Sequence, residues 1–286
     1  MSGAHSQPNP AAQSFLARLQ NKVCAMVLSG ICEREYTAEN GQTLRYMFFP
    51  AKSDTLVIGF QACNDAGARY NYVTTLRSCK VNCLFIKDDF GPDGFGDYYL
   101  GCNGTYSVED AVMELIGHYT YSRSPKRLIF AGSSKGGYAA LSFGLRFPDA
   151  EMIIAAPQYR LGDYLLGDNG NGRYADTVEE ILGEPANPDG ISMLNSRLAH
   201  IIQNDPFADT QRVFIHYSAK EHTYPEHIRY LLQDLEKKGI YVEKDEKDYS
   251  NHGDLKYYFP EYLKEKVCRG KSLFSSARYN NYIILR

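Results

Sequence analysis

The stretch Phe130–Leu141, FAGSSKGGYAAL, places two adjacent serines between glycines inside an otherwise apolar run. Residues 127–131 before it read as a buried strand, and a small-residue helical pattern follows it. Residues 132–136 match G-x-S-x-G with Ser134 at the centre. In that context the pattern is typical of a nucleophile elbow, a tight strand-to-helix turn that exposes a serine. The flanking glycines leave room for a strained backbone and for close helix packing.

Two other interpretations compete for these residues. One is an ordinary strand-to-helix turn with a capping serine, and the other is a phosphate-binding loop. The phosphate patterns G-x-x-x-x-G-K-[ST] and G-x-G-x-x-G are both absent here. We therefore interpret Ser134 as a nucleophile. The backbone N–H of Lys135, at the helix N-terminus, would be one oxyanion donor, and those of Gln61 and Ala62, after the strand 55–60, are candidates for the second.

A serine hydroxyl needs a base to remove its proton, and in this type of fold the acid and then the histidine follow the serine along the chain. His252 lies in a polar loop between a strand and the last helix, where that base is expected. The acid is expected after the preceding strand, which favours Glu221. Asp248 is the lower-ranked alternative, because it lies only four residues before His252.

Three other histidines follow Ser134 near the end of the sheet. His216 lies inside a strand, where a buried neutral role is expected. His227 lies in a helix beside Glu226 and is predicted to lie on a solvated face, and His222 is the direct neighbour of Glu221. We expect none of the three to be the base.

Strand patterns alternate with helix patterns, which predicts a mainly parallel sheet with helices on both faces. We expect an α/β-hydrolase fold over residues 21–270, with a small cap insertion at 159–205, a disordered or loosely ordered lead at 1–20 and a C-terminal extension at 271–286. Two early strands, 43–49 and 55–60, are joined by a short turn and suggest an antiparallel start to the sheet. The last helix is expected to be interrupted near Pro260, and Ser107 is expected to cap an earlier helix.

Composition excludes several classes of partner. The net charge of −3 favours neither nucleic acid nor an anionic membrane, and no run of 18 apolar residues could span a bilayer. The polar N-terminus lacks an apolar signal core, and the seven scattered cysteines indicate thiols in a reducing cytosol. The spacing of Cys79 and Cys83 is one that metal sites sometimes use, but the sequence has no second cysteine or histidine pair to complete the set of ligands. No metal site is therefore expected. We expect a cytoplasmic location.

With these residues gathered, the chain resembles the α/β-hydrolase-fold O-acetyltransferases of bacterial capsular polysaccharide, of the serogroup A meningococcal type. The likeness is carried by G-S-S-K-G-G at 132–137, A-P-Q at 156–158, Leu161, and D-Y at 163–164. The chain is also similar to the glycan acetyltransferase component of the streptococcal accessory secretion system. That relative uses a glutamate as the triad acid, which supports Glu221, whereas the capsule enzyme uses an aspartate near the same place.

The resemblance implies an acyl-enzyme on Ser134, acetyl-CoA as donor substrate with no bound cofactor, and a hydroxyl of a capsular polysaccharide or other glycan as acceptor. A homo-oligomer or a capsule-synthesis complex is compatible with it. Two alternatives stay open at this point: a carbohydrate esterase or deacetylase with the same triad, and a non-catalytic component of a capsule or glycan-export complex.

Overall fold

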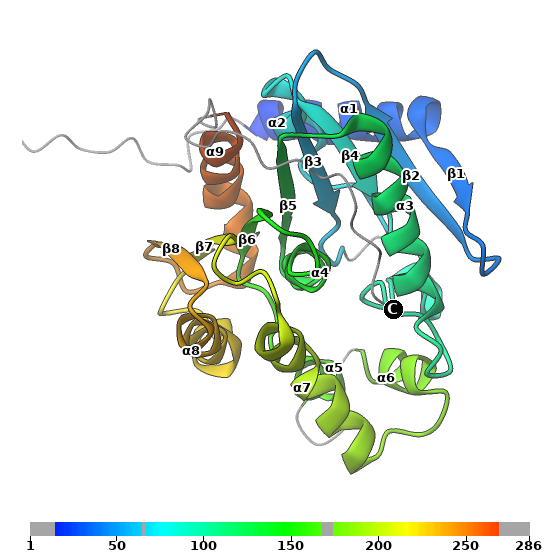
Figure 1. The fold of residues 1–286 in the computed structure, drawn as a ribbon, viewed down its shortest axis with the longest axis vertical. Coiled ribbons are helices and arrows are strands. Elements are labelled where there is room, and N and C mark those ends of the chain that lie inside the picture. Colours follow the sequence, from blue (N-terminus) through cyan, green and yellow to red (C-terminus); the bar gives the residue numbers. More distant parts are fainter. Residues whose placement is uncertain (1–14, 65–66, 168–173, 269–286) are drawn as a thin grey trace, which may run out of the picture.

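The computed structural model describes residues 15–64, 67–167 and 174–268. It is built around one eight-stranded sheet with the strand order β1-β2-β4-β3-β5-β6-β7-β8 (Figure 1). Strands β3 to β8 run parallel to one another, whereas β2 pairs antiparallel with both β1 and β4. The strands are β1 Arg34–Thr37, β2 Thr43–Phe49, β3 Thr55–Phe60, β4 Asn82–Ile86, β5 Arg127–Ser133, β6 Glu151–Ala155, β7 Arg212–Tyr217 and β8 Tyr241–Glu246.

Helices cover both faces of the sheet. The helices α1, α2 and α9 lie toward one face, and α3, α4 and α8 pack against the other (Figure 1). The α-helices are α1 Phe15–Cys32, α2 Val73–Ser78, α3 Ser107–Arg123, α4 Lys135–Gly144, α5 Leu161–Leu166, α6 Ala175–Leu182, α7 Pro188–Asn204, α8 Arg229–Lys238 and α9 Leu255–Cys268. Three short turns complete the order: η2 Pro92–Gly94, the π-helix η4 Tyr224–Ile228 and η5 His252–Asp254. This arrangement confirms the predicted mainly parallel sheet.

Two buried clusters explain why the central strands are apolar without interruption. Successive side chains of a strand point to opposite faces, so Met47 joins the cluster under α2 and α9, whereas Phe48 joins the one under α3 and α4. All six residues of β3 are buried, as expected for a parallel strand covered on both faces.

Several local predictions need correction. The strands β2 and β3 are consecutive in sequence but are not neighbours, because β4 lies between them. Residues 15–20 of the predicted loose lead belong to α1, while residues 1–14 and the predicted C-terminal extension lie outside the described residues. The last helix runs through Pro260 without a break. Ser107 is the first residue of α3, and Tyr106 is its N-cap.

The cysteines also differ from the prediction. Cys79, at the end of α2, forms a disulfide with Cys268, at the end of α9, with their Cα atoms 5.3 Å apart. The interpretation of all seven cysteines as thiols is therefore wrong for this pair, which is separated by 189 positions and could not be recognised from local spacing. Over the described ranges, no helix is long and apolar enough to cross a membrane.

Candidate active site

Ser134 lies between β5 and α4 with φ 52° and ψ −122°, a positive-φ backbone conformation that a non-glycine residue adopts only at some cost. Its N–H donates to the carbonyl of Ala155 at the end of β6 (2.8 Å), and its own carbonyl accepts from Gly137 (2.9 Å). A Cβ at Gly136 would lie 2.7 Å from the carbonyl oxygen of Phe60, so only glycine fits there. These are the strained turn and close packing that the G-x-S-x-G pattern predicted.

The side chain of Ser134 is nearly buried, at 6% exposed. The side-chain amide of Gln158 donates to its hydroxyl, with Nε2 2.9 Å from Oγ. Gln158 follows β6, the strand next to β5, and is fully buried. The sequence places Gln158 in the A-P-Q motif but does not predict its contact with Ser134.

Glu221 and His252 are hydrogen-bonded, with Oε1 of Glu221 2.7 Å from Nδ1 of His252. Glu221 follows β7 and is buried, and the hydroxyl of Thr223 donates to its other oxygen (2.8 Å). Burial alone would raise the pKa of Glu221, but the hydrogen bond and charge of His252 outweigh it, so the pKa lies below its ordinary value. A carboxylate on Nδ1 fixes the imidazole so that Nε2 is the free basic nitrogen.

The structure distinguishes the two candidate acids by their contacts. Asp248 forms an exposed ion pair with Lys220 (2.7 Å), and its side chain is 77% exposed. Glu221 is the carboxylate that contacts His252. Among the described residues no hydrogen bond joins His252 to Ser134; the partner of the serine hydroxyl is Gln158.

The remaining histidines occupy different surroundings. His216 is buried in β7, as expected, with Nδ1 2.7 Å from Asp245. The prediction of a solvated face for His227 is wrong, because it is 2% exposed and its Nδ1 accepts the backbone N–H of Arg160 (3.2 Å). Burial, followed by the nearby charges of His222 and Arg160, lowers the pKa of His227 to about 4.

The predicted oxyanion donors after β3 have internal acceptors. The N–H of Gln61 donates to the hydroxyl of Tyr99 (2.8 Å). The N–H of Ala62 donates to the side-chain oxygen of Asn71 (2.9 Å). Lys135 stands at the first position of α4, directly after Ser134, so its N–H belongs to the first helical turn.

The side chain of Lys135 is a further feature that sequence reasoning missed. Its ammonium lies 2.7 Å from Oδ2 of Asp88, and both side chains are fully buried. Asp88 lies in an aspartate-rich loop after β4 and also accepts the backbone N–H groups of Asp97 (3.1 Å) and Tyr99 (3.3 Å). A lysine at the start of an apolar helix needs an anionic partner, and that signal could have pointed to the aspartate-rich loop.

Helices α5, α6 and α7 group together beyond one end of the sheet, within the range predicted as a cap (Figure 1). Residues 168–173 of that range lie outside the described residues. The division of the chain into lead, domain, cap and extension stays a prediction.

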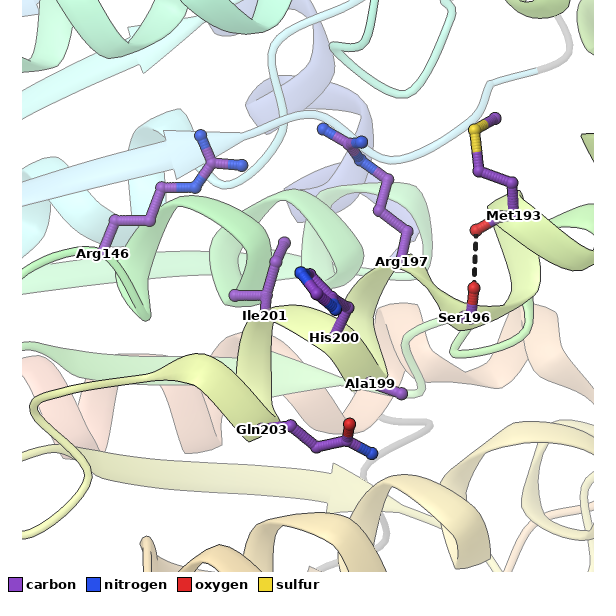
Figure 2. Close-up of a pocket in the computed structure, with 8 residues that line it drawn as sticks. All are labelled: Arg146, Met193, Ser196, Arg197, Ala199, His200, Ile201 and Gln203. Atoms are coloured by element: carbon purple, nitrogen blue, oxygen red, sulfur yellow. Dashed lines mark hydrogen bonds between the residues drawn. The ribbon is translucent and has the colours of Figure 1, made fainter. Parts of the chain in front are cut away.

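A cavity of about 540 Å³ lies between α7 and the far end of α4 (Figure 2). Arg146 and Arg197 line it, and both side chains hydrogen-bond to the buried carboxylate of Glu109. Arg146 follows α4, whose first residue adjoins Ser134, so a helix of ten residues, roughly 15 Å long, separates this cavity from Ser134. The cavity is therefore distinct from the site around Ser134.

Similar folds are found among solved structures. A mutant of the capsule O-acetyltransferase of Neisseria meningitidis serogroup A, in complex with CoA, has a TM-score of 0.65 at 19% identity, over 84% of this chain and 99% of that one. The Glycosylation Associate Protein (Gap123) complex from Streptococcus agalactiae has a TM-score of 0.67 at 17% identity, over 84% of this chain and 47% of that one. The fluorophosphonate-binding serine hydrolase FphF of Staphylococcus aureus has a TM-score of 0.54 at 12% identity, over 82% and 95%.

Neither a scan of protein-family models nor a search of curated proteins by sequence finds a match. The structural similarities lie at low sequence identity, so they bear on the fold. They cover more than four fifths of this chain, whose own mainly parallel sheet has helices on both faces. The chain thus has the α/β-hydrolase fold, and its fold is shared with the meningococcal capsule O-acetyltransferase and the streptococcal glycosylation-associated complex.

Proposed function

We propose that this protein is a serine O-acetyltransferase that moves an acetyl group from acetyl-CoA to a hydroxyl of a cell-surface glycan. Ser134 is the nucleophile, His252 the general base and Glu221 the acid that orients it. The observation that carries the proposal is the 2.7 Å hydrogen bond between the buried Glu221 and the partly exposed His252, in a fold whose β5–α4 turn strains Ser134 into an elbow. The solved relative that was crystallised with CoA supports the choice of donor.

In the first step His252 takes the proton of Ser134 while Oγ bonds to the thioester carbonyl carbon, and the carbonyl electron pair moves to oxygen. As the tetrahedral intermediate collapses, the C–S bond breaks and the proton passes from His252 to the departing thiolate, giving CoA and an acetyl ester on Ser134. In the second step His252 takes the proton of the glycan hydroxyl, whose oxygen attacks the ester. The proton then returns to Oγ and the acetylated sugar leaves.

Transfer requires that the glycan hydroxyl reach the acyl-enzyme faster than water does. The cap range 159–205 is proposed to limit solvent access and to orient the acceptor. A homo-oligomer or a complex with capsule-synthesis proteins is compatible with this role, and the similarity to a complex component supports the second.

The test is to incubate the protein with acetyl-CoA alone and to analyse its peptides by mass spectrometry. The peptide that contains Ser134 should gain one acetyl group, and the Ser134→Ala variant should gain none. The Ser133→Ala variant is the matched control, because Ser133 ends β5 and its hydroxyl pairs with that of Tyr72 (2.6 Å), away from the elbow position. Ser133→Ala should keep the label.

Addition of candidate glycans then separates transfer from hydrolysis. Acetate release at the same rate with and without every glycan tried would favour an esterase with the same triad. Absence of an adduct and of turnover with acetyl-CoA and with activated esters would favour a non-catalytic component.

A further inference from the structure

We propose that the side-chain amide of Gln158 is a catalytic hydrogen-bond donor at Ser134 and provides the second oxyanion contact. This inference rests on the proposed acyl-enzyme function and replaces the role that sequence reasoning assigned to the loop after β3. Its starting observation is the contact of 2.9 Å between Nε2 of Gln158 and Oγ of Ser134. Gln158 is fully buried, so this donor acts in a site from which water is excluded.

The surroundings of Gln158 orient its amide. The hydroxyl of Tyr98, itself buried, donates to Oε1 of Gln158 (3.5 Å), which turns the NH2 group toward Ser134. The backbone leading to it is held as well, because the N–H of Ala156 donates to the carbonyl of His216 (3.0 Å). An amide carries two N–H donors, and Ser134 takes one of them.

The backbone N–H groups of Gln61 and Ala62, after β3, already have hydrogen-bond acceptors within the protein. The hydroxyl of Tyr99 accepts the N–H of Gln61 and donates its own proton to the carbonyl of Ile86 (3.0 Å), so both of its roles are used. The side chain of Asn71 accepts the N–H of Ala62. An oxyanion on that side would have to displace the buried Tyr99 or the half-buried Asn71. Gln158 comes from β6, on the opposite side of β5, and already points at the reacting oxygen.

The chemistry places negative charge where this amide donates. When Oγ attacks, the oxyanion forms on the same carbon that Oγ has bonded, so the two oxygens are immediate neighbours. A donor beside Oγ therefore needs only a small shift to bond the oxyanion, together with the N–H of Lys135. Removal of one such donor typically lowers kcat by about 10²–10³.

The first test compares the wild type with Gln158→Met, which keeps the length of the side chain and removes its donor. A fluorophosphonate is the probe, because its phosphonyl oxygen occupies the oxyanion position and its reaction with Ser134 needs neither acetyl-CoA nor a glycan. We expect the phosphonylation rate and kcat to fall about 10²–10³-fold, with little change in KM for acetyl-CoA.

A second variant, Gln158→Glu, separates a donor from a packing role. Its carboxylate cannot donate, but the protonated carboxyl can, so the ratio of its phosphonylation rate to the wild-type rate should rise as the pH falls, whereas the same ratio for Gln158→Met should not. The ratio is the readout because protonation of the base His252 slows every variant alike. This comparison stands even if Gln158→Met folds poorly. A Gln158→Glu rate that follows the wild-type pH profile would overturn the inference.

Asn71→Ala is the matched control on the β3 side, because it frees the N–H of Ala62. Under the inference, the double variant Gln158→Met/Asn71→Ala is as slow in phosphonylation as Gln158→Met alone. If Gln158→Met reacts at the wild-type rate, or if the double variant regains that rate, the second donor lies after β3 and the proposed function still stands. Failure of the wild type itself to be labelled at Ser134 would overturn both.

Discussion

The ammonium of Lys135 lies 2.7 Å from the carboxylate of Asp88, and neither side chain is exposed to solvent. This ion pair joins the first residue after Ser134, the proposed nucleophile, to the loop that follows β4. The backbone carbonyl of Phe95, in the same loop, also accepts from the ammonium (3.0 Å). The turn that carries Ser134 is therefore fixed by a charge contact as well as by its glycines.

Loss of one partner of this pair should destabilise the protein strongly. Lys135→Met leaves the carboxylate of Asp88 buried without its cation, and we expect a loss of about 3–5 kcal/mol in the free energy of unfolding. The double variant Lys135→Met/Asp88→Asn removes both charges and should be more stable than Lys135→Met alone. Urea denaturation of the wild type and the variants measures this. Equal stability of the single variant and the wild type would show that the pair does not hold the turn.

Glu221→Gln should lower acyl transfer with little change in fold. The amide keeps the size of the carboxylate but can no longer stabilise the imidazolium that forms on His252, and the loss for triad acids of this kind is about 10⁴-fold in kcat. Asp248→Asn is the control, because that carboxylate is exposed and pairs with Lys220. Rates of acetyl-CoA consumption should separate the two variants; similar losses in both would contradict the assignment of Glu221.

The elbow could be predicted from sequence because its requirements are local. A side chain at Gly132 would clash with the backbone of the same turn, and one at Gly136 would clash with the backbone at the end of β3. Both glycines lie within two residues of Ser134, so they form a recognisable local pattern. The parallel sheet was predictable for a similar reason, since strands covered on both faces must be apolar throughout.

Contacts between distant segments could not be predicted in this way. Gln158 and Asp88 contact the elbow across 24 and 47 positions, and neither the A-P-Q motif nor the aspartate-rich loop indicates which residue it contacts. His227 was misassigned because a π-helix at Tyr224–Ile228 shifts the helical register, so its imidazole packs on the ring of Tyr164. Helical periodicity counts 3.6 residues per turn and therefore misplaces side chains that follow such a turn.

His227 should make the protein less stable as the pH falls. Its pKa is about 4 in the folded state, below the ordinary value of 6.5, so the unfolded chain binds the proton more tightly. The stability that this histidine contributes is present above pH 6.5 and is lost as the pH falls toward 4, by up to about 3 kcal/mol. In His227→Asn the amide oxygen can replace Nδ1 as acceptor for the N–H of Arg160.

Denaturation of the wild type and His227→Asn between pH 7 and pH 4 tests this. The variant should lose less stability than the wild type over that interval. Glu221, whose pKa is also lowered, loses its contribution only at more acidic pH, as its carboxylate is protonated in the folded state. Parallel stability curves for the two proteins would show that His227 is not the group that titrates.

The disulfide between Cys79 and Cys268 should stabilise the fold by tying α2 to α9. Both helices begin near the candidate site, since Tyr72 caps α2 and contacts Ser133, and His252 lies just before α9. Under oxidising conditions, Cys79→Ser should have a free energy of unfolding about 2–4 kcal/mol below that of the wild type. When the wild type is reduced, the two proteins should be about equally stable.

Thiol titration of the unfolded protein provides the direct check. Of the seven cysteines, five should react before reduction and all seven after it. Disulfides are typical of oxidising compartments, so this count also bears on the cytoplasmic location, which stays a prediction. If seven thiols react in protein prepared without reductant, the two cysteines are neighbours without a bond, and α2 and α9 are held together by packing alone.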